Sequence, residues 1–300
     1  MELGVRIERL KPLESVGVDN IKLACVHGGE DLSRPMRALS QSAVETLANV
    51  LSTFKINDIQ MGTNVEISLS QLKPRRTRVE LTFIYFDIPF WRAEVGKIAL
   101  FIGGIAFENK TITGEEFQRV KESGYLDDGT IIPFHQFPCL IVDGVSIAQT
   151  GGIARVCGKL SGMYPRTNDI LAAQIDQYLD IATDITVLVS SAGGEEDDEK
   201  RKTLRQEMCS GVLGRKLQIL DKNIADDSDW VLGQSMGLAD IAIWRLMGWL
   251  SSGMLDGIPT NLLKGYPKIS RVCSAVDMHP KIQEWVSQTY PKDYIRGNYL

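Results

Sequence analysis

The stretch PCLIVDGVSIAQTGGIARVCGKL, residues 138–160, decides the fold. Residues 138–142 and 145–148 are short apolar runs, and the Asp143-Gly144 pair between them is typical of a two-residue hairpin turn. Residues 151–160 then carry apolar side chains at helical spacing. The stretch therefore predicts a β-hairpin that is followed directly by a helix.

A strand, a helix and a second strand are predicted ahead of this hairpin. Residues 79–86 (VELTFIYF) are rich in β-branched and aromatic side chains, which favour a strand. Residues 92–102 have helical periodicity and end at Gly103-Gly104, a signal for a helix C-terminus. Residues 105–112 predict the second strand. The order β-α-β, hairpin, helix is that of a thioredoxin-like domain, which we expect over residues 79–163.

The remainder of the chain predicts one helix after another. Residues 171–189 form a long apolar-periodic stretch, and residues 190–202 (SSAGGEEDDEKRK) predict a solvated charged loop before helices resume at Leu204. Residues 237–250 (GLADIAIWRLMGWL) are apolar nearly all round, which predicts a buried central helix. We expect an all-helical C-terminal domain over residues 167–300.

Residues 1–78 differ in charge from the rest of the chain. They hold nine acidic and eleven basic residues, a net charge of +2, whereas the whole chain has −5 and the remainder therefore −7. Residues 43–54 predict a helix, residues 64–72 a strand and residues 73–78 an exposed basic linker. We expect an N-terminal extension of unknown role, either an accessory element or a mobile arm.

Composition excludes several classes of function. The net charge of −5 is small and of the wrong sign for a nucleic-acid-binding protein. No run of 18 apolar residues predicts a membrane span, and the N-terminus lacks the apolar core of a secretory signal. The five cysteines have no metal-site spacing, so we expect no metal and reduced thiols in the cytoplasm. Organelle targeting by residues 1–78 stays open.

Short motifs across both predicted domains resemble those of tyrosine-type cytosolic glutathione transferases, with the Sigma and Mu classes most similar. The motifs occur in the family's order: Tyr85-Phe86-Asp87-Ile88, Arg92-Ala93-Glu94, Phe134-His135-Gln136-Phe137-Pro138, Val142-Asp143-Gly144, Ala148-Gln149-Thr150, Ile153-Ala154-Arg155, Leu238-Ala239-Asp240, Tyr266-Pro267-Lys268 and Pro280-Lys281-Ile282. The resemblance implies a thioredoxin-like domain that binds glutathione and an all-helical domain that follows it.

The resemblance also implies that Tyr85 is the catalytic residue. A thiol is a poor nucleophile until it loses its proton, and a hydroxyl donor aimed at the sulfur stabilises the thiolate. The chain has one residue more between Tyr85 and Arg92 than is usual in the family, so an ungapped match places Phe86 in the catalytic position instead. We prefer Tyr85, because the Tyr-Phe-Asp-Ile match is better and a loop accommodates an insertion readily.

Ten further positions match glutathione-binding residues of the family: Phe86, Arg92, Phe117, Lys121, Gln136, Phe137, Pro138, Gln149, Thr150 and Asp184. Gln149 and Thr150, where a strand turns into a helix, suit the γ-glutamyl end, since helix N-termini bind carboxylates. A cis Pro138 presents the backbone of Phe137 to the tripeptide. Lys121 matches a lysine for the glycyl carboxylate, although a solvated surface lysine is an equal alternative.

Three of these matches carry particular implications. Arg92 lies close to the sulfur in the family. Phe117 replaces a tryptophan and cannot donate a hydrogen bond. Asp184 matches an acid that reaches the glutathione amine of a neighbouring subunit, and the fold implies a homodimer with Phe134 as an interface key.

The expected function is conjugation of glutathione, as co-substrate, to a small apolar electrophile, as in detoxification. Two alternatives remain: a glutathione-dependent isomerase, and a non-catalytic binding or structural protein with the same fold. The non-catalytic alternative is left open by the extra residue after Tyr85, by Phe117 and His135, and by the N-terminal extension. Retention of Gln136, Pro138, Gln149 and Thr150 argues against it.

Overall fold

The computed structural model describes residues 3–9, 21–27, 79–233 and 235–299. It divides into two units, residues 1–78 and residues 79–300, which are described separately. In the first unit, β1 (Leu3–Arg9) and β2 (Ile21–His27) pair in antiparallel fashion, with Val5 opposite Cys25. The helix, strand and basic linker expected at 43–54, 64–72 and 73–78 lie outside the described residues.

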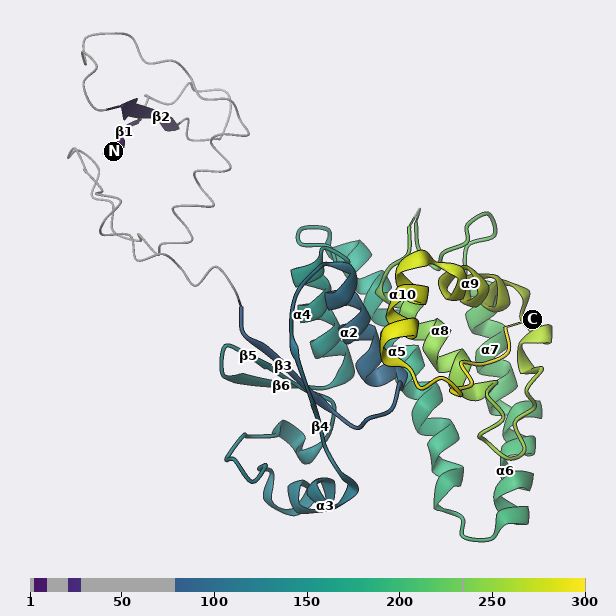
Figure 1. The fold of residues 1–300 in the computed structure, drawn as a ribbon. Coiled ribbons are helices and arrows are strands. Elements are labelled where there is room, and N and C mark those ends of the chain that lie inside the picture. Colours follow the sequence, from purple (N-terminus) through teal and green to yellow (C-terminus); the bar gives the residue numbers. More distant parts are fainter. Residues whose placement is uncertain (1–2, 10–20, 28–78, 234, 300) are drawn as a thin grey trace. The chain divides into compact units, whose positions relative to one another are not determined.

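A four-stranded sheet forms the first part of the second unit (Figure 1). Its strands are β3 (Leu81–Tyr85), β4 (Glu108–Thr111), β5 (Cys139–Val142) and β6 (Val145–Ala148), in the order β4-β3-β5-β6. β3 and β4 are parallel, and the other pairs are antiparallel. Asp143 and Gly144 join β5 to β6 with φ angles of 49° and 83°, as a two-residue hairpin turn requires. The predicted hairpin is confirmed.

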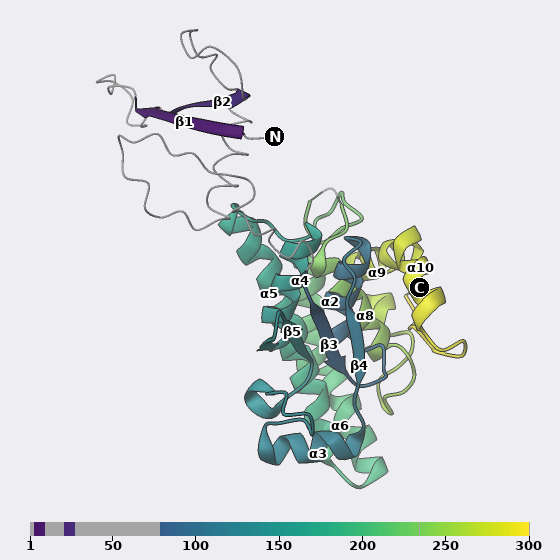
Figure 2. The same cartoon turned by 60° about the vertical axis from the view of Figure 1, so that its left-hand side comes forward.

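Helices cover both faces of this sheet. α2 (Trp91–Ile102) and α4 (Thr150–Ser161) pack beside each other on the face that carries Phe83 and Tyr85 (Figures 1 and 2). α3 (Gly114–Ser123) lies on the opposite face, where its Val120 packs against Ile84. Successive residues of β3 therefore point into different cores, as strand geometry requires.

The C-terminal part is helical throughout its regular elements. It contains α5 (Asp169–Ser191), α6 (Asp198–Ser210), α7 (Val212–Asn223), α8 (Leu238–Leu250), α9 (Pro267–Met278) and α10 (Pro280–Thr289). α8 is buried along nearly its whole length and packs against α2, α5 and α9. The expected fold, a thioredoxin-like domain followed by an all-helical domain, is confirmed. No helix in the described part of the chain is long and apolar enough to cross a membrane.

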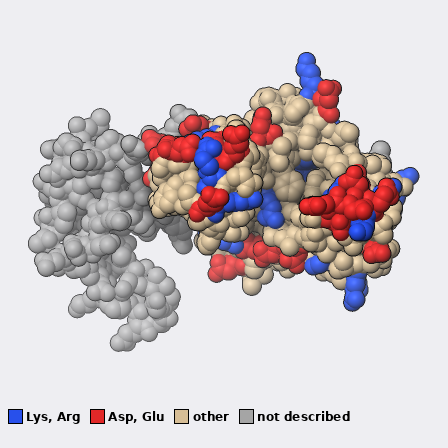
Figure 3. All heavy atoms as spheres, turned by 90° about the horizontal axis from the view of Figure 1, so that it is seen from below, with Lys and Arg blue, Asp and Glu red and all other residues tan. Residues whose placement is uncertain are grey.

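The charged loop predicted at 190–202 is shorter than expected. α5 continues to Ser191, a short 3-10 turn covers Ala192–Gly194, and α6 begins at Asp198. The Asp197 carboxylate caps α6 by accepting a hydrogen bond from the Lys200 N–H at 3.0 Å. Acidic residues at a helix N-terminus also interact favourably with the helix dipole, so this charge run starts a helix rather than a loop. Figure 3 shows a concentration of acidic side chains on the right-hand part of the surface.

Candidate functional site

The start of α4 has the features of a carboxylate site. Gln149, the N-cap residue, has φ 68° and ψ 126° and makes no side-chain capping hydrogen bond. Thr150 is buried, and its Oγ1 has no hydrogen-bond partner among the described residues. The first N–H groups of a helix also lack intrahelical partners. A buried hydroxyl and free N–H groups at one helix end suit an anionic oxygen, as the sequence predicted for Gln149 and Thr150.

The Phe137-Pro138 peptide lies beside this helix start. Cys139 of β5 pairs with Ala148 of β6, which brings the residues just before β5 next to those just after β6. The Phe137-Pro138 bond is cis, as the resemblance implied. Four predicted residues are thereby brought to one edge of the sheet. We call this arrangement of Phe137, Pro138, Gln149 and Thr150 the cradle.

An aromatic cluster adjoins the cradle through Phe137. The Phe117 ring lies 5.9 Å from the Phe137 ring, and the Phe86 ring lies 5.4 Å from Phe117 and 6.2 Å from Phe137, all edge to face. The Lys121 ammonium lies 4.5 Å from the centre of the Phe117 ring. Gln136 is exposed just before the cradle. The structure therefore brings Phe86, Phe117, Lys121 and Gln136 to the same region as the cradle.

Tyr85 lies on the other face of the sheet from this aromatic cluster. It is 5% exposed and belongs to the core beneath α2, and its ring meets that of Phe86 edge to face at 5.4 Å. Burial raises the pKa of Tyr85 to about 12, opposed by the positive charge of Arg92. The Tyr85 hydroxyl therefore stays protonated near neutral pH and can act only as a donor or a neutral acceptor.

Arg92 lies on α2, near Tyr85. Its side chain is half-buried, and its guanidinium lies 5.5 Å from the centre of the Trp91 ring. Burial lowers the pKa of Arg92, while the nearby Tyr85 opposes that change. A positive charge here stabilises negative charge that develops close to Tyr85.

Asp184 and Phe134 are not part of this group. Asp184 lies on α5 with its side chain 62% exposed, and it forms an ion pair with Lys216 at 3.2 Å. Phe134 is 71% exposed and has a φ angle of 58°. Among the described residues, no hydrogen bond, ion pair or ring contact joins either side chain to the cradle. No cluster of three or more His, Cys, Asp or Glu side chains suits a metal ion in the described part of the chain.

Two charged residues that the sequence analysis did not single out are deeply buried. Arg245 in α8 is 1% exposed, and Lys97 in α2 is 6% exposed. Each stands within an otherwise apolar helical stretch, GLADIAIWRLMGWL for Arg245 and VGKIALFI for Lys97. That contrast was visible in the sequence, because Arg and Lys are rarely fully buried. The partners of each residue could come only from the structure.

The fold is shared with solved glutathione S-transferase structures, and comparisons of the sequence find similarity to the same family. Residues 183–289 match the family model described as the glutathione S-transferase C-terminal domain. The chain is 25% identical to glutathione S-transferase 1 of Ascaris suum, over 68% of this chain and 94% of the relative. It is 28% identical to hematopoietic prostaglandin D synthase of Gallus gallus, over 70% of this chain and 96% of the relative.

Solved structures with this fold include the prostaglandin synthase D of Nilaparvata lugens. The match has a TM-score of 0.59 at 21% identity and covers 71% of this chain and 98% of the other. Residues 183–289 are thus similar to the C-terminal domain of glutathione S-transferases, and the chain shares its two-domain fold with this solved structure.

Proposed function

We propose that this chain is a tyrosine-type glutathione transferase that joins the glutathione sulfur to a small apolar electrophile. The observation that carries the proposal is the cradle, above all the buried Thr150 hydroxyl at the start of α4, which has no hydrogen-bond partner among the described residues. Burying a hydroxyl without a hydrogen-bond partner costs free energy, unless a bound ligand supplies that partner. The γ-glutamyl carboxylate of glutathione has the charge and size for that position.

The remaining residues of the site contact different parts of the tripeptide. The backbone of Phe137 pairs with the middle of glutathione as a neighbouring strand would. Lys121 attracts the glycyl carboxylate, and Phe117 contributes only apolar contact there. Gln136 adds a polar contact at the exposed edge of the groove.

Tyr85 donates its hydroxyl proton in a hydrogen bond to the thiolate, and the charge of Arg92 adds to this stabilisation. A donor to the charged form lowers the thiol pKa, so more thiolate is present near neutral pH. The thiolate then forms a bond to an electrophilic carbon, and the leaving group departs with its electron pair. With chlorodinitrobenzene, chloride leaves.

Sigma- or Mu-like class, a detoxifying role and a cytoplasmic location are parts of the same proposal. So is a homodimer in which Phe134 enters the partner and Asp184 meets the partner's glutathione. The domain boundaries 79–163 and 167–300, with 1–78 as an added extension, complete it.

A second candidate is a glutathione-dependent isomerase, in which the sulfur adds to the substrate and then leaves again. The relative in Gallus gallus that carries a prostaglandin D synthase name favours it. A third candidate, a non-catalytic binding protein, is favoured by the ring cluster, because Phe86 rather than Tyr85 meets Phe117 and Phe137.

The test is the initial rate with glutathione and chlorodinitrobenzene for wild type, Tyr85→Phe and Tyr125→Phe. Tyr125 is 53% exposed and serves as the matched control. We expect Tyr85→Phe to lose at least about tenfold in rate, as loss of one donor to a developing anion does, and Tyr125→Phe to equal wild type. An active wild type with an equally active Tyr85→Phe would reject Tyr85. Glutathione binding without turnover on several electrophiles would favour the non-catalytic candidate.

A further inference from the structure

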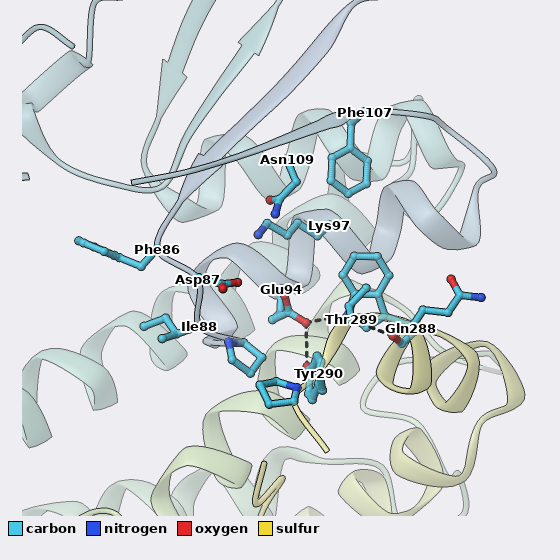
Figure 4. A pocket seen from close by; sticks show the side chains of 13 residues that line it. Phe86, Asp87, Ile88, Glu94, Lys97, Phe107, Asn109, Gln288, Thr289 and Tyr290 are labelled. Atoms are coloured by element: carbon cyan, nitrogen blue, oxygen red, sulfur yellow. Dashed lines mark hydrogen bonds between the residues drawn. The ribbon is translucent and has the colours of Figure 1, made fainter. Parts of the chain in front are cut away.

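A cavity of about 520 Å³ lies beside α2, apart from the cradle. Its walls come from the segment after β3, from α2, from β4 and the residue before it, and from the end of α10 with the residues that follow it (Figure 4). Phe86 is the one residue that it shares with the aromatic cluster, and no cradle residue lines it. The volume is within the range of small-molecule sites. We call it the Lys97 pocket.

Lys97 carries a buried positive charge into this pocket. It is 6% exposed and lines the cavity, yet its ammonium makes no hydrogen bond or ion pair within the part of the chain that the structure describes. The nearest aromatic contact is the Phe83 ring, whose centre is 5.5 Å away. Burial lowers the pKa of Lys97, and the carboxylates of Glu94 and Asp87 oppose that change. An ammonium that lines a cavity without a direct partner is a site for an acceptor.

Glu94 places an acceptor in the same pocket. It precedes Lys97 by three residues, so both side chains lie on one face of α2 (Figure 4). Glu94 is 3% exposed, and its Oε2 accepts hydrogen bonds from the Trp285 Nε1–H at 2.8 Å and the Tyr290 hydroxyl at 2.7 Å. Its Oε1 has no such partner among the described residues. That oxygen can accept a hydrogen bond from a ligand.

The charges around the pocket disfavour a charged ligand. An anion drawn to Lys97 meets the negative charges of Glu94 and of Asp87, which is exposed at the rim. A cation drawn to those carboxylates meets Lys97. A neutral group that offers a carbonyl oxygen to the ammonium and an N–H to the Glu94 carboxylate satisfies both without adding a buried charge.

The other walls favour a flat aromatic body. Phe86, Phe107 and Trp285 line the cavity, with Asn109 and Gln288 as neutral polar groups beside them. Aromatic walls contribute contact area and edge or face stacking to a planar ring. We propose that the Lys97 pocket binds a planar aromatic molecule that carries a neutral amide or lactam edge, its carbonyl on Lys97 and its N–H on Glu94.

Three matched probes test the charge class: 2-naphthamide, 2-naphthoate and 2-naphthylmethylamine, with binding to the full chain measured by titration calorimetry at neutral pH. We expect the amide to bind at least about tenfold more tightly than either charged probe. Tighter binding of naphthoate would make this an anion site and overturn the proposal. Tighter binding of the amine, or no binding of the amide, would overturn it equally.

Two variants and one competitor test the location. Lys97→Met keeps the length of the side chain and removes the ammonium, and we expect it to weaken naphthamide binding about tenfold. Lys222→Met, at an exposed lysine of α7, is the control and should leave binding unchanged. S-hexylglutathione should not displace the amide. If Lys97→Met bound naphthamide as tightly as wild type, or if S-hexylglutathione competed with it, the assignment of naphthamide to the Lys97 pocket would be overturned. Because the assay needs no glutathione turnover, its outcome is independent of the proposed transferase activity.

Discussion

The Arg245 Nη2–H donates a 2.8 Å hydrogen bond to the Pro89 carbonyl oxygen, across 156 positions of the sequence. The same guanidinium donates to the Arg296 carbonyl at 2.9 Å and to the Tyr294 hydroxyl at 2.8 Å. Among the described residues no carboxylate pairs with it directly. One buried arginine therefore ties both the segment after Tyr85 and the C-terminal tail to α8, and neutral oxygens accept its hydrogen bonds.

Replacing Arg245 by Met should lower the free energy of unfolding by about 1–3 kcal/mol. The change leaves the carbonyl of buried Pro89 with only the long 3.4 Å contact from the Tyr294 hydroxyl, and a buried group that loses its donor costs about 1–3 kcal/mol. The Arg296 carbonyl keeps the Tyr299 hydroxyl as a donor at 2.8 Å. Urea unfolding measures the loss. Arg119→Met is the control, because its ion pair with Asp127 is exposed and contributes about 0.5 kcal/mol or less. Equal midpoints for the two variants would show that Arg245 does not hold these segments.

Thr150→Val should weaken glutathione binding without lowering the free energy of unfolding. The Thr150 Oγ1 forms no hydrogen bond within the described part of the chain, so its loss should leave the free energy of unfolding unchanged or raised. If the hydroxyl binds the γ-glutamyl carboxylate, the KM for glutathione should rise about tenfold, whereas Thr150→Ser should stay near wild type. A rate series over glutathione concentration, with thermal unfolding alongside, checks both halves. An unchanged KM would show that the Thr150 hydroxyl does not bind glutathione.

Features whose signal is local could be predicted from the sequence. The hairpin at Asp143-Gly144 follows from turn chemistry, and α8 follows from an apolar pattern all round the helix. α3 gave no such signal, because Val120 is its one buried residue. It depends on caps instead: Thr113 Oγ1 accepts from the Glu116 N–H at 3.2 Å, and Gly124 ends the helix with φ 76°.

The candidate site was predictable in its parts but not in its orientation. The motif order marked Gln149 and Thr150 as a helix start, yet only the structure reveals that the Thr150 hydroxyl has no partner in residues 79–233 and 235–299 or in the two described N-terminal strands. Whether Tyr85 or Phe86 faces the aromatic cluster depends on the residue at which β3 ends. A shift of one residue reverses the face of every side chain in a strand, so a one-residue insertion could not be resolved by pattern.

Thr186→Val should weaken the joint between the sheet domain and the helices. The Trp91 Nε1–H in α2 donates to the Thr186 Oγ1 in α5 at 2.8 Å, and both residues are buried. Removing the acceptor leaves a buried indole N–H unpaired, which should cost about 1–3 kcal/mol in urea unfolding. Thr183→Val, one turn earlier on α5, removes a half-buried hydroxyl that bonds only the Leu179 carbonyl of its own helix at 3.1 Å. A loss as large for Thr183→Val would contradict a special role for the Trp91 contact.

Asp240 should make stability depend on pH in the acid range. Burial raises its pKa from 3.8 to about 6 in the folded protein, although its carboxylate accepts hydrogen bonds from the Val231 and Gly237 N–H groups. Between these two pKa values the folded state binds more protons than the unfolded state, so stability falls as the pH rises through that window and is level above it.

The Asn variant of Asp240 isolates this titration. Asp240→Asn loses one of the two acceptors and should be less stable than wild type near pH 4. Because an amide does not titrate in this range, position 240 adds no pH dependence to the stability of the variant. The difference in free energy of unfolding, wild type minus Asp240→Asn, should therefore shrink by about 3 kcal/mol between pH 3.5 and 7, from a shift of about 2 pKa units. Urea unfolding at intervals of half a pH unit measures it. Parallel pH profiles for the two proteins would mean that the carboxyl of Asp240 is ionised throughout this range, held so by the two backbone hydrogen bonds despite its burial.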